Sequence, residues 1–225
     1  MDKFIPTSSD TILTAAAALF RRHGISGTTI RAIAEAADML PGSVTYRYST
    51  KDVLVVALME RAVAQVSAQV LVAVERSQNP VERLRLAMRA HLRVLLGGDD
   101  AVYVLLFDWQ RLPAATRQQL SAERQRYESI WDGLMYAAAA SGQLVPGLDL
   151  ALVRKFAFGA ANSVAFWYRP DGPRSPDEIA DAFSVLIGFG TVADEARSPE
   201  SIDTYRKMGV LAAATKTGSM GGTHA

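Results

Sequence analysis

The chain has 225 residues, of which 49% are hydrophobic and 21% are charged, the balance of a folded protein and not of a disordered one. Its 24 basic and 23 acidic side chains give a formal net charge of +1, so any attraction to nucleic acid must come from a local patch. The absence of Cys and the scatter of three His exclude disulfides and argue against a metal site, and we expect no cofactor.

The first part of the chain predicts three short helices. Their expected ranges are residues 8–24, 29–37 and 41–48, with a tight turn at Asp38 and Met39 between the last two. Ser8 or Ser9 is the expected N-cap of the first helix, and Gly24 is its expected end.

Helical periodicity continues through the rest of the chain. Further helices are expected over residues 51–76, 81–96, 101–111, 113–142, 150–168 and 177–195, separated by short breaks. We therefore predict an all-α protein of about nine helices. The predicted organisation is a DNA-binding domain (8–54), an effector-binding and dimerisation domain (55–197) and a disordered tail (209–225), because the tail is rich in Gly, Ser, Thr and Ala.

The second and third short helices have the arrangement of a helix-turn-helix, whose second helix enters the DNA major groove. At 100° per residue, Val44 and Tyr48 face inward, toward Phe20 and Ile33, and the small, polar and aromatic residues between them face outward. An ordinary helical hairpin with a solvated face would show the same periodicity. The predicted DNA contacts are Thr29, Arg31, Pro41, Gly42, Ser43, Thr45, Tyr46, Arg47 and Lys51.

The segments "ILTAAAALFRRHGISGTTIRAIAEAA" and "PGSVTYRYSTKDVLVVAL" closely resemble the DNA-binding domain of TetR-family transcriptional repressors. The resemblance covers residues 8–60 and implies a homodimer on a two-fold symmetric DNA operator, with a C-terminal domain that binds an inducer. Asp38 stands where many members have Gly, and Leu40 stands where Ser or Thr usually caps the recognition helix. Thr45 occupies a frequent Tyr position, with the aromatic residue following at Tyr46.

The larger half of the chain is rich in aromatic residues, which usually form core at helical spacing. Polar residues within its apolar faces, such as His91 and Asn162, need a partner, which can be a side chain, a water molecule or a ligand. The predicted ligand contacts are Met88, His91, Tyr103, Phe107, Trp109, Trp131, Asn162, Ser163 and Trp167.

A second resemblance lies in "WQRLP" and "ANSVAFWYRPDGPRSPDEIADAFSVLIGFG". These segments look like the C-terminal domain of TetR-type repressors of steroid side-chain and fatty-acid catabolism, which respond to acyl-CoA thioesters. The resemblance implies a small hydrophobic effector of this class. Its phosphates would need cations, for which Arg154, Lys155, Arg169 and Arg174 are candidates, although each is equally typical of a solvated helix end.

The last two helices predict the dimer interface, because their small residues allow close approach in a four-helix contact between two chains, as the resemblance implies. The predicted interface residues are Ala161, Ala165, Phe183 and Ile187.

The same features leave two alternatives to an acyl-CoA-responsive repressor. One is a TetR-type regulator of an efflux system that senses an apolar drug-like ligand, and another is a helical binding scaffold without DNA specificity. An enzyme is not expected, because no paired carboxylates, Ser-His-Asp set, phosphate loop or metal spacing occurs. No basic leader and no uninterrupted apolar run of about 18 residues occurs, so a cytoplasmic protein without a membrane partner is predicted.

Overall fold

The computed structural model describes residues 7–191, which form ten α-helices and one short 3₁₀ turn, without a β-strand. The all-α prediction is confirmed. The elements are α1 (Ser8–Gly27), α2 (Ile30–Ala36), α3 (Pro41–Arg47), α4 (Lys51–Val74), α5 (Pro80–Leu96), α6 (Asp100–Asp108), η1 (Trp109–Arg111), α7 (Ala114–Gln119), α8 (Ser121–Ala140), α9 (Leu150–Trp167) and α10 (Pro176–Thr191). The predicted tail at 209–225 and the last residues of the predicted helix 177–195 lie outside the described residues.

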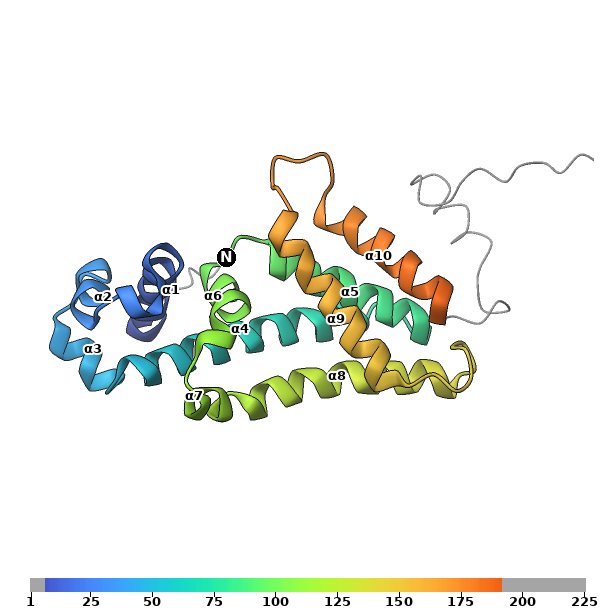
Figure 1. Ribbon diagram of the computed structural model, residues 1–225, viewed down its shortest axis with the longest axis horizontal. Coiled ribbons are helices and arrows are strands. Elements are labelled where there is room, and N and C mark those ends of the chain that lie inside the picture. Colours follow the sequence, from blue (N-terminus) through green and yellow to red (C-terminus); the bar gives the residue numbers. More distant parts are fainter. Residues whose placement is uncertain (1–6, 192–225) are drawn as a thin grey trace, which may run out of the picture.

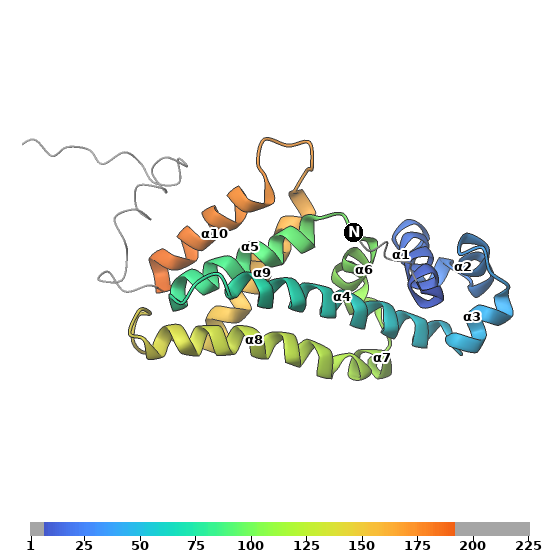
Figure 2. The ribbon, with the colours of Figure 1, turned by 180° about the vertical axis from the view of Figure 1, so that it is seen from behind.

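The molecule is elongated, with α1 to α3 at one end and a bundle of α5, α8, α9 and α10 at the other (Figure 1). Helix α4 runs from one end to the other, and α6 stands between α1 and the bundle in both Figure 1 and Figure 2. This arrangement joins the two ends through shared helices and leaves no flexible linker between them.

Helix α1 begins and ends differently from the prediction. Thr7, not Ser8 or Ser9, is the N-cap, because its hydroxyl accepts from Asp10 N at 3.2 Å while the Asp10 carboxylate accepts from Thr7 N at 3.0 Å. The Thr7 hydroxyl, which also donates to the Asp10 carboxylate at 2.7 Å, and the Thr7 amide together lower the pKa of Asp10. At Gly24 the backbone turns sharply, with φ of 74°, and one further turn of helix then continues to Gly27.

The turn between α2 and α3 takes the form that the sequence suggested. Asp38 has φ of 54°, in the left-handed region where Asp is tolerated better than most residues. Leu40 is the N-cap of α3 and supplies no side-chain hydrogen bond, but Pro41 occupies the first position, where the missing N–H costs nothing. The start of α3 is therefore favoured by the fixed backbone angle of Pro41 and not by a hydrogen bond from a polar N-cap side chain.

The core at the α1 to α3 end confirms the predicted orientation of α3. Val44 and Tyr48 are buried together with Phe20 of α1 and Ile33 of α2. The same cluster continues along α4 to Ala62 and includes residues 101–104 of α6. The predicted boundary between residues 54 and 55 thus falls inside one continuous helix and one continuous core.

By length and composition α4 is apolar enough to cross a membrane, although the sequence contains no uninterrupted apolar run of that length. However, 44% of its most apolar 18-residue stretch is buried inside the protein, and core helices of soluble proteins have the same length and composition. Its buried side chains, such as Leu58, Val70 and Val74, pack against the other helices.

The predicted helix over residues 113–142 is divided into α7 and α8 at Leu120, so the described residues hold one helix more than expected. Leu120 is buried in the core. The Ser121 hydroxyl donates to the Gln118 carbonyl at 2.6 Å, a local bond that competes with the regular helical ladder. Such side-chain competition is not visible in the apolar pattern.

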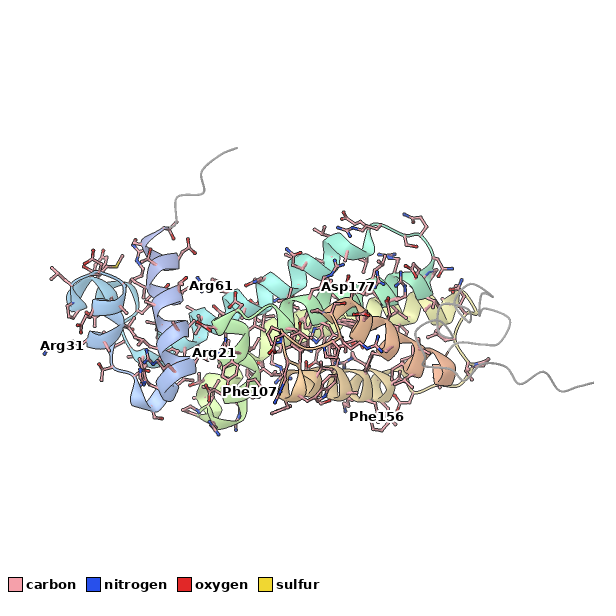
Figure 3. The ribbon with its side chains drawn as sticks, turned by 90° about the horizontal axis from the view of Figure 1, so that it is seen from above. Arg21, Arg31, Arg61, Phe107, Phe156 and Asp177 are labelled. Atoms are coloured by element: carbon pink, nitrogen blue, oxygen red, sulfur yellow. The ribbon has the colours of Figure 1, made fainter. Side chains whose placement is uncertain are left out.

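Helix α10 lies along α5 and is held there by ion pairs (Figure 2). Arg85 and Arg89 both donate to Asp181, and Arg93 donates to Asp177 with Nε to Oδ1 of 2.5 Å. The hydrogen bond from Arg93 lowers the pKa of Asp177. Asp177 lies at the junction of these helices in Figure 3.

Candidate DNA-binding face and effector cavity

The outward face of α3 is small, polar and aromatic. Gly42, Ser43 and Tyr46 are exposed, and the Tyr46 side chain is 93% accessible to solvent. A large aromatic side chain held this far from the core contributes nothing to packing, whereas a protruding ring and hydroxyl suit contact with base edges in a groove.

Two of the predicted DNA contacts also make hydrogen bonds that hold the domain together. Lys51 Nζ donates to the carbonyls of Ile25 at 2.8 Å and Thr28 at 3.1 Å, which anchors the end of α1 to the start of α4. Arg47 Nη1 donates to Ser9 Oγ at 2.6 Å and so ties α3 to α1. Both cations still lie on the DNA-facing end, but their positions are fixed by bonds within the protein.

The remaining predicted contacts lie at the surface. Thr29 caps α2 by accepting from Ala32 N at 3.1 Å, and Thr45 donates back to the carbonyls of Pro41 and Gly42. Arg31 makes no hydrogen bond or ion pair with the described residues and points away from the molecule at its end (Figure 3). It is therefore the cation of this face that is most available to a phosphate.

A cavity of about 490 Å³ lies between α4, α5, α6, α8 and α9. Its wall is mainly aliphatic and aromatic. The lining residues are Ala62, Val63, Val66, His91, Leu95, Val102, Leu105, Leu106, Trp109, Arg124, Tyr127, Glu128, Arg154, Lys155, Phe158 and Asn162. This size and lining are those of a small-molecule site.

His91 is the central polar group of this wall. Its Nδ1 lies 2.8 Å from Tyr127 Oη, and its Nε2 lies 3.2 Å from Asn162 Oδ1. Burial lowers the pKa of His91 to about 4, so the imidazole is neutral at physiological pH. Burial likewise raises the pKa of the Tyr127 hydroxyl.

Three cations also line the cavity. Arg154 is engaged by Glu128 at 2.6 Å and Asp132 at 2.8 Å, and Arg124 lies over the Trp109 ring at 4.3 Å. Lys155 is exposed and makes no ion pair with any described residue. The cavity thus combines an apolar wall with an available positive charge at its surface. The other two predicted cations, Arg169 and Arg174, are not among the lining residues.

The nine predicted ligand contacts are divided by the structure. His91, Trp109 and Asn162 line the cavity. Of the others, Met88 and Trp131 are buried in the bundle core, Tyr103 and Phe107 stack on each other at 4.3 Å, and Ser163 and Trp167 are exposed on α9. Aromatic content alone therefore did not separate cavity wall from core or surface.

Two groups of cavity residues were not predicted from the aromatic pattern. Phe158 and Glu128 lie three positions from the predicted residues Lys155 and Trp131, and Arg124 lies seven positions before Trp131, so a common helical face could have revealed them. The α4 residues Ala62, Val63 and Val66 are aliphatic and read as core in any sequence pattern.

An exposed apolar face runs along α9. Leu152 and Phe156 lie on it one helical turn apart, Trp167 lies on the same side about three turns further along, and Phe156 projects outward in Figure 3. Ala161, predicted at the dimer interface, is instead fully buried, because α9 turns its Phe158 and Val164 side toward the bundle core. Of the other predicted interface residues, Phe183 packs on that core, and Ala165 and Ile187 are partly exposed.

Arg21 of α1 joins the DNA-binding end to the cavity-lining helix α6. Its Nη1 donates to Asp100 Oδ1 at 2.8 Å and to the Gly98 carbonyl at 3.2 Å, and its guanidinium lies 4.7 Å from the Tyr103 ring centroid. Figure 3 shows Arg21 at this junction. One side chain thus contacts the start of α6 at three points.

A short helix displayed outward by a helix-turn-helix, joined to a helical bundle with an internal cavity, defines a DNA-binding regulator with an effector domain. A family model for bacterial regulatory proteins of the tetR family matches residues 12–58, and one for the C-terminal domain of tetracyclin repressor-like proteins matches residues 77–190. The chain belongs to the TetR family.

Known proteins of similar sequence and structure agree with this assignment. The HTH-type transcriptional repressor KstR2 of Mycobacterium tuberculosis (strain ATCC 25618 / H37Rv) is 26% identical over 177 residues, which are 78% of this chain and 88% of KstR2. The crystal structure of AibR in complex with isovaleryl coenzyme A and operator DNA has a TM-score of 0.70 and 27% identity, covering 81% of this chain and 97% of AibR.

The crystal structure of superantigen PfiT is also similar, with a TM-score of 0.72 and 28% identity over 84% of this chain and 97% of that one. The same fold therefore occurs in proteins whose names describe different functions. The function of this chain has to be inferred from its sites and not from its fold alone.

Proposed function

We propose that the protein is a cytoplasmic transcriptional repressor that binds a palindromic operator as a homodimer and is released by a small hydrophobic effector, an acyl-CoA thioester. The observation that carries the proposal is the position of the cavity. Its walls include α4 and α6, the same two helices that pack against α1 of the DNA-binding end.

The exposed face of α3 supports DNA recognition. Tyr46 and Ser43 offer hydrogen bonds to bases, and Gly42 lets the backbone come close to DNA. Arg31 and the N-terminus of α2 supply phosphate contacts. Such a small surface gives modest affinity by itself, and two copies spaced about 34 to 36 Å apart would read successive major grooves.

The apolar face of α9 supports the homodimer. Phe156 is 65% exposed and Trp167 is 59% exposed, and Leu186 of α10 is also accessible. Exposed apolar side chains that gather on one surface are normally covered by another protein. A symmetric contact of α9 and α10 with their copies would bury it and would fix the distance between the two α3 helices.

The cavity chemistry supports an acyl-CoA effector. An aliphatic and aromatic wall suits an acyl chain, and the exposed ammonium of Lys155, with Arg124 nearby in the wall, suits the phosphates of a coenzyme. The similar protein AibR forms a complex with isovaleryl coenzyme A and operator DNA. We therefore expect this chain to bind an acyl-CoA and an operator as well.

Effector binding would weaken DNA binding by changing the spacing of the two recognition helices. A ligand between α4 and α6 displaces or stabilises these helices, and each contacts α1. The effect requires the ligand to favour one arrangement of the dimer over another.

The direct test is an electrophoretic mobility assay with a duplex from the region upstream of the protein's own gene. We expect retarded migration at physiological salt that a scrambled duplex does not show, and loss of the retarded band when an acyl-CoA is added. Equal retardation of both duplexes would indicate nonspecific binding and would contradict the proposal.

A further inference from the structure

Besides its charged residues Arg124, Glu128, Arg154 and Lys155, the cavity wall contains one neutral polar cluster. It consists of His91 from α5, Tyr127 from α8 and Asn162 from α9, and all three side chains line the cavity. Phe158 and Trp131 surround the imidazole, with ring centroids 5.5 Å and 6.1 Å from it. Three helices therefore contribute to a single polar spot.

The hydrogen bonds of this cluster have a defined direction. Because the Asn162 carbonyl oxygen can only accept, the Nε2–H of His91 donates to it across 3.2 Å. The Nδ1 of the neutral ring then accepts from the Tyr127 hydroxyl across 2.8 Å. Both nitrogens of His91 are thus occupied within the protein, and the imidazole is not available to a ligand.

The group that this network leaves free is the Asn162 amide nitrogen. Its two N–H donors form no hydrogen bond with any residue of the described chain, although the side chain lines the cavity. The hydrogen bond to His91 holds the carboxamide in place and keeps its oxygen turned toward the imidazole. Asn162 is half-buried and its amide nitrogen is not sealed from solvent, so a ligand that displaces water from the cavity leaves this donor without a partner unless the ligand itself carries an acceptor.

The acceptor is expected to be uncharged. The cationic residue nearest along the cavity-facing side of α9 is Lys155, seven residues and therefore about 10 Å along the helix axis from Asn162. Arg154 is already engaged by Glu128 and Asp132. No cation belongs to the His91, Tyr127 and Asn162 cluster itself, so a carboxylate there would lose its hydration without gaining a countercharge.

We propose that Asn162 is a specificity residue that selects effectors whose acyl group carries an uncharged oxygen acceptor, such as a ketone, in preference to plain hydrocarbon chains. This inference rests on the proposed acyl-CoA function and names the chemistry at the apolar end of the ligand. The apolar wall takes the carbon skeleton, and the Asn162 amide donates to the oxygen within it.

The test compares octanoyl-CoA with its 5-oxo and 7-oxo derivatives by isothermal titration calorimetry on the full-length protein. We expect at least one oxo derivative to bind about tenfold more tightly than octanoyl-CoA, the ratio for one well-formed buried hydrogen bond. Asn162→Leu, which removes the donor, should bind octanoyl-CoA at least as well as the wild type and should lose the preference.

Asn162→Ala provides a second variant if the leucine disturbs folding. Its methyl group has no N–H to donate, so the preference for the oxo derivatives should again be lost. Ser163→Ala is the matched control, because the neighbouring Ser163 hydroxyl is exposed and donates to the Ala160 carbonyl at 2.7 Å, and it should keep the wild-type preference.

Two failures can be told apart. If octanoyl-CoA binds and the wild type shows no preference for either oxo derivative, or if the preference survives in both Asn162 variants, the role of Asn162 is wrong and the acyl-CoA function stands. If none of the three thioesters binds, the acyl-CoA function itself is wrong, and the inference about Asn162 falls with it.

Discussion

Val44 and Tyr46 are two positions apart on α3 and lie in opposite environments. Val44 is fully buried against α1 and α2, whereas Tyr46 is exposed. Helical periodicity predicted this contrast, because a seven-residue helix packed on one side has little freedom in its orientation. The roles of Arg47 and Lys51 could not be predicted in the same way, since their partners lie on α1 and depend on the tertiary arrangement.

Substitutions on the two faces of α3 should therefore affect different properties, DNA recognition for the exposed face and stability for the buried face. Tyr46→Ala should leave the thermal midpoint unchanged and remove about 1 to 3 kcal/mol of discrimination between operator and scrambled duplex. Val44→Asp should destabilise the domain by about 3 to 5 kcal/mol, because it places an unpaired charge in the core. Thermal unfolding and duplex titration measure both effects. A large drop in the midpoint for Tyr46→Ala would show that α3 is rotated from the orientation described.

His91 should make stability depend on pH in a predictable direction. Its pKa in the folded protein is about 4, below the ordinary value of 6.5, because the ring is buried. As the pH falls below 6.5 the unfolded chain binds this proton first, so the free energy of unfolding decreases until about pH 4. Chemical denaturation at several pH values should show a shallower decrease for His91→Gln than for the wild type. Parallel curves would mean that His91 does not titrate as a buried neutral ring.

At the scale of the helices, α6 is the element that connects the cavity to the DNA-binding end. It contributes Val102, Leu105 and Leu106 to the cavity wall and Asp100 to the contact with Arg21. The existence of this helix was predicted from its apolar period. Its position against α1 was not predicted, because contacts between distant parts of the chain leave no periodic signal.

Arg21→Ala should weaken communication without weakening either binding event. The contact is partly exposed, so its loss should cost less than about 1 kcal/mol of stability. We expect the factor by which octanoyl-CoA lowers operator affinity to decrease, measured as the ratio of operator affinities with and without the thioester. Arg22→Ala is the control, because Arg22 is exposed on the same helix and makes no ion pair with the described residues. An unchanged ratio in Arg21→Ala would exclude this contact as a route of coupling.

The sequence located part of the cavity. His91 and Asn162 could be recognised because a polar residue in an apolar helical face requires a partner, and they proved to be partners of each other on the cavity wall. Trp131 and Trp167 could not be assigned by the same reasoning, since one is buried core and the other is surface. Whether an aromatic ring lines a cavity depends on how several helices pack, which one helix does not encode.

For the molecule as a whole, no described residue covers the exposed face of α9. The contact between two chains predicted from small residues on the last two helices stays a prediction. Ala161, expected on that surface, belongs to the protomer core, whereas Phe156 belongs to the exposed face. The error follows from a rotation of α9 that only the packing against α5 and α8 determines.

Charges placed on this face should produce a monomer. Phe156→Glu and Trp167→Glu each put a carboxylate on the proposed interface, so we expect a halved mass in analytical ultracentrifugation and a loss of operator binding with retained helicity. Val72→Glu on α4, an exposed apolar position outside this face, is the matched control and should remain dimeric. A wild-type protein that sediments as a monomer would contradict the proposed dimer.

The most direct test of effector-controlled repression is the affinity of octanoyl-CoA for the protein with and without saturating operator duplex. Because coupling between two binding sites is reciprocal, a thioester that releases DNA must bind more weakly when DNA is present, by the same factor. We predict a factor of roughly 5 to 150, the usual range for coupled sites. Equal affinities in the two titrations would show that the cavity and the DNA-binding face are not coupled, and would contradict the proposed function.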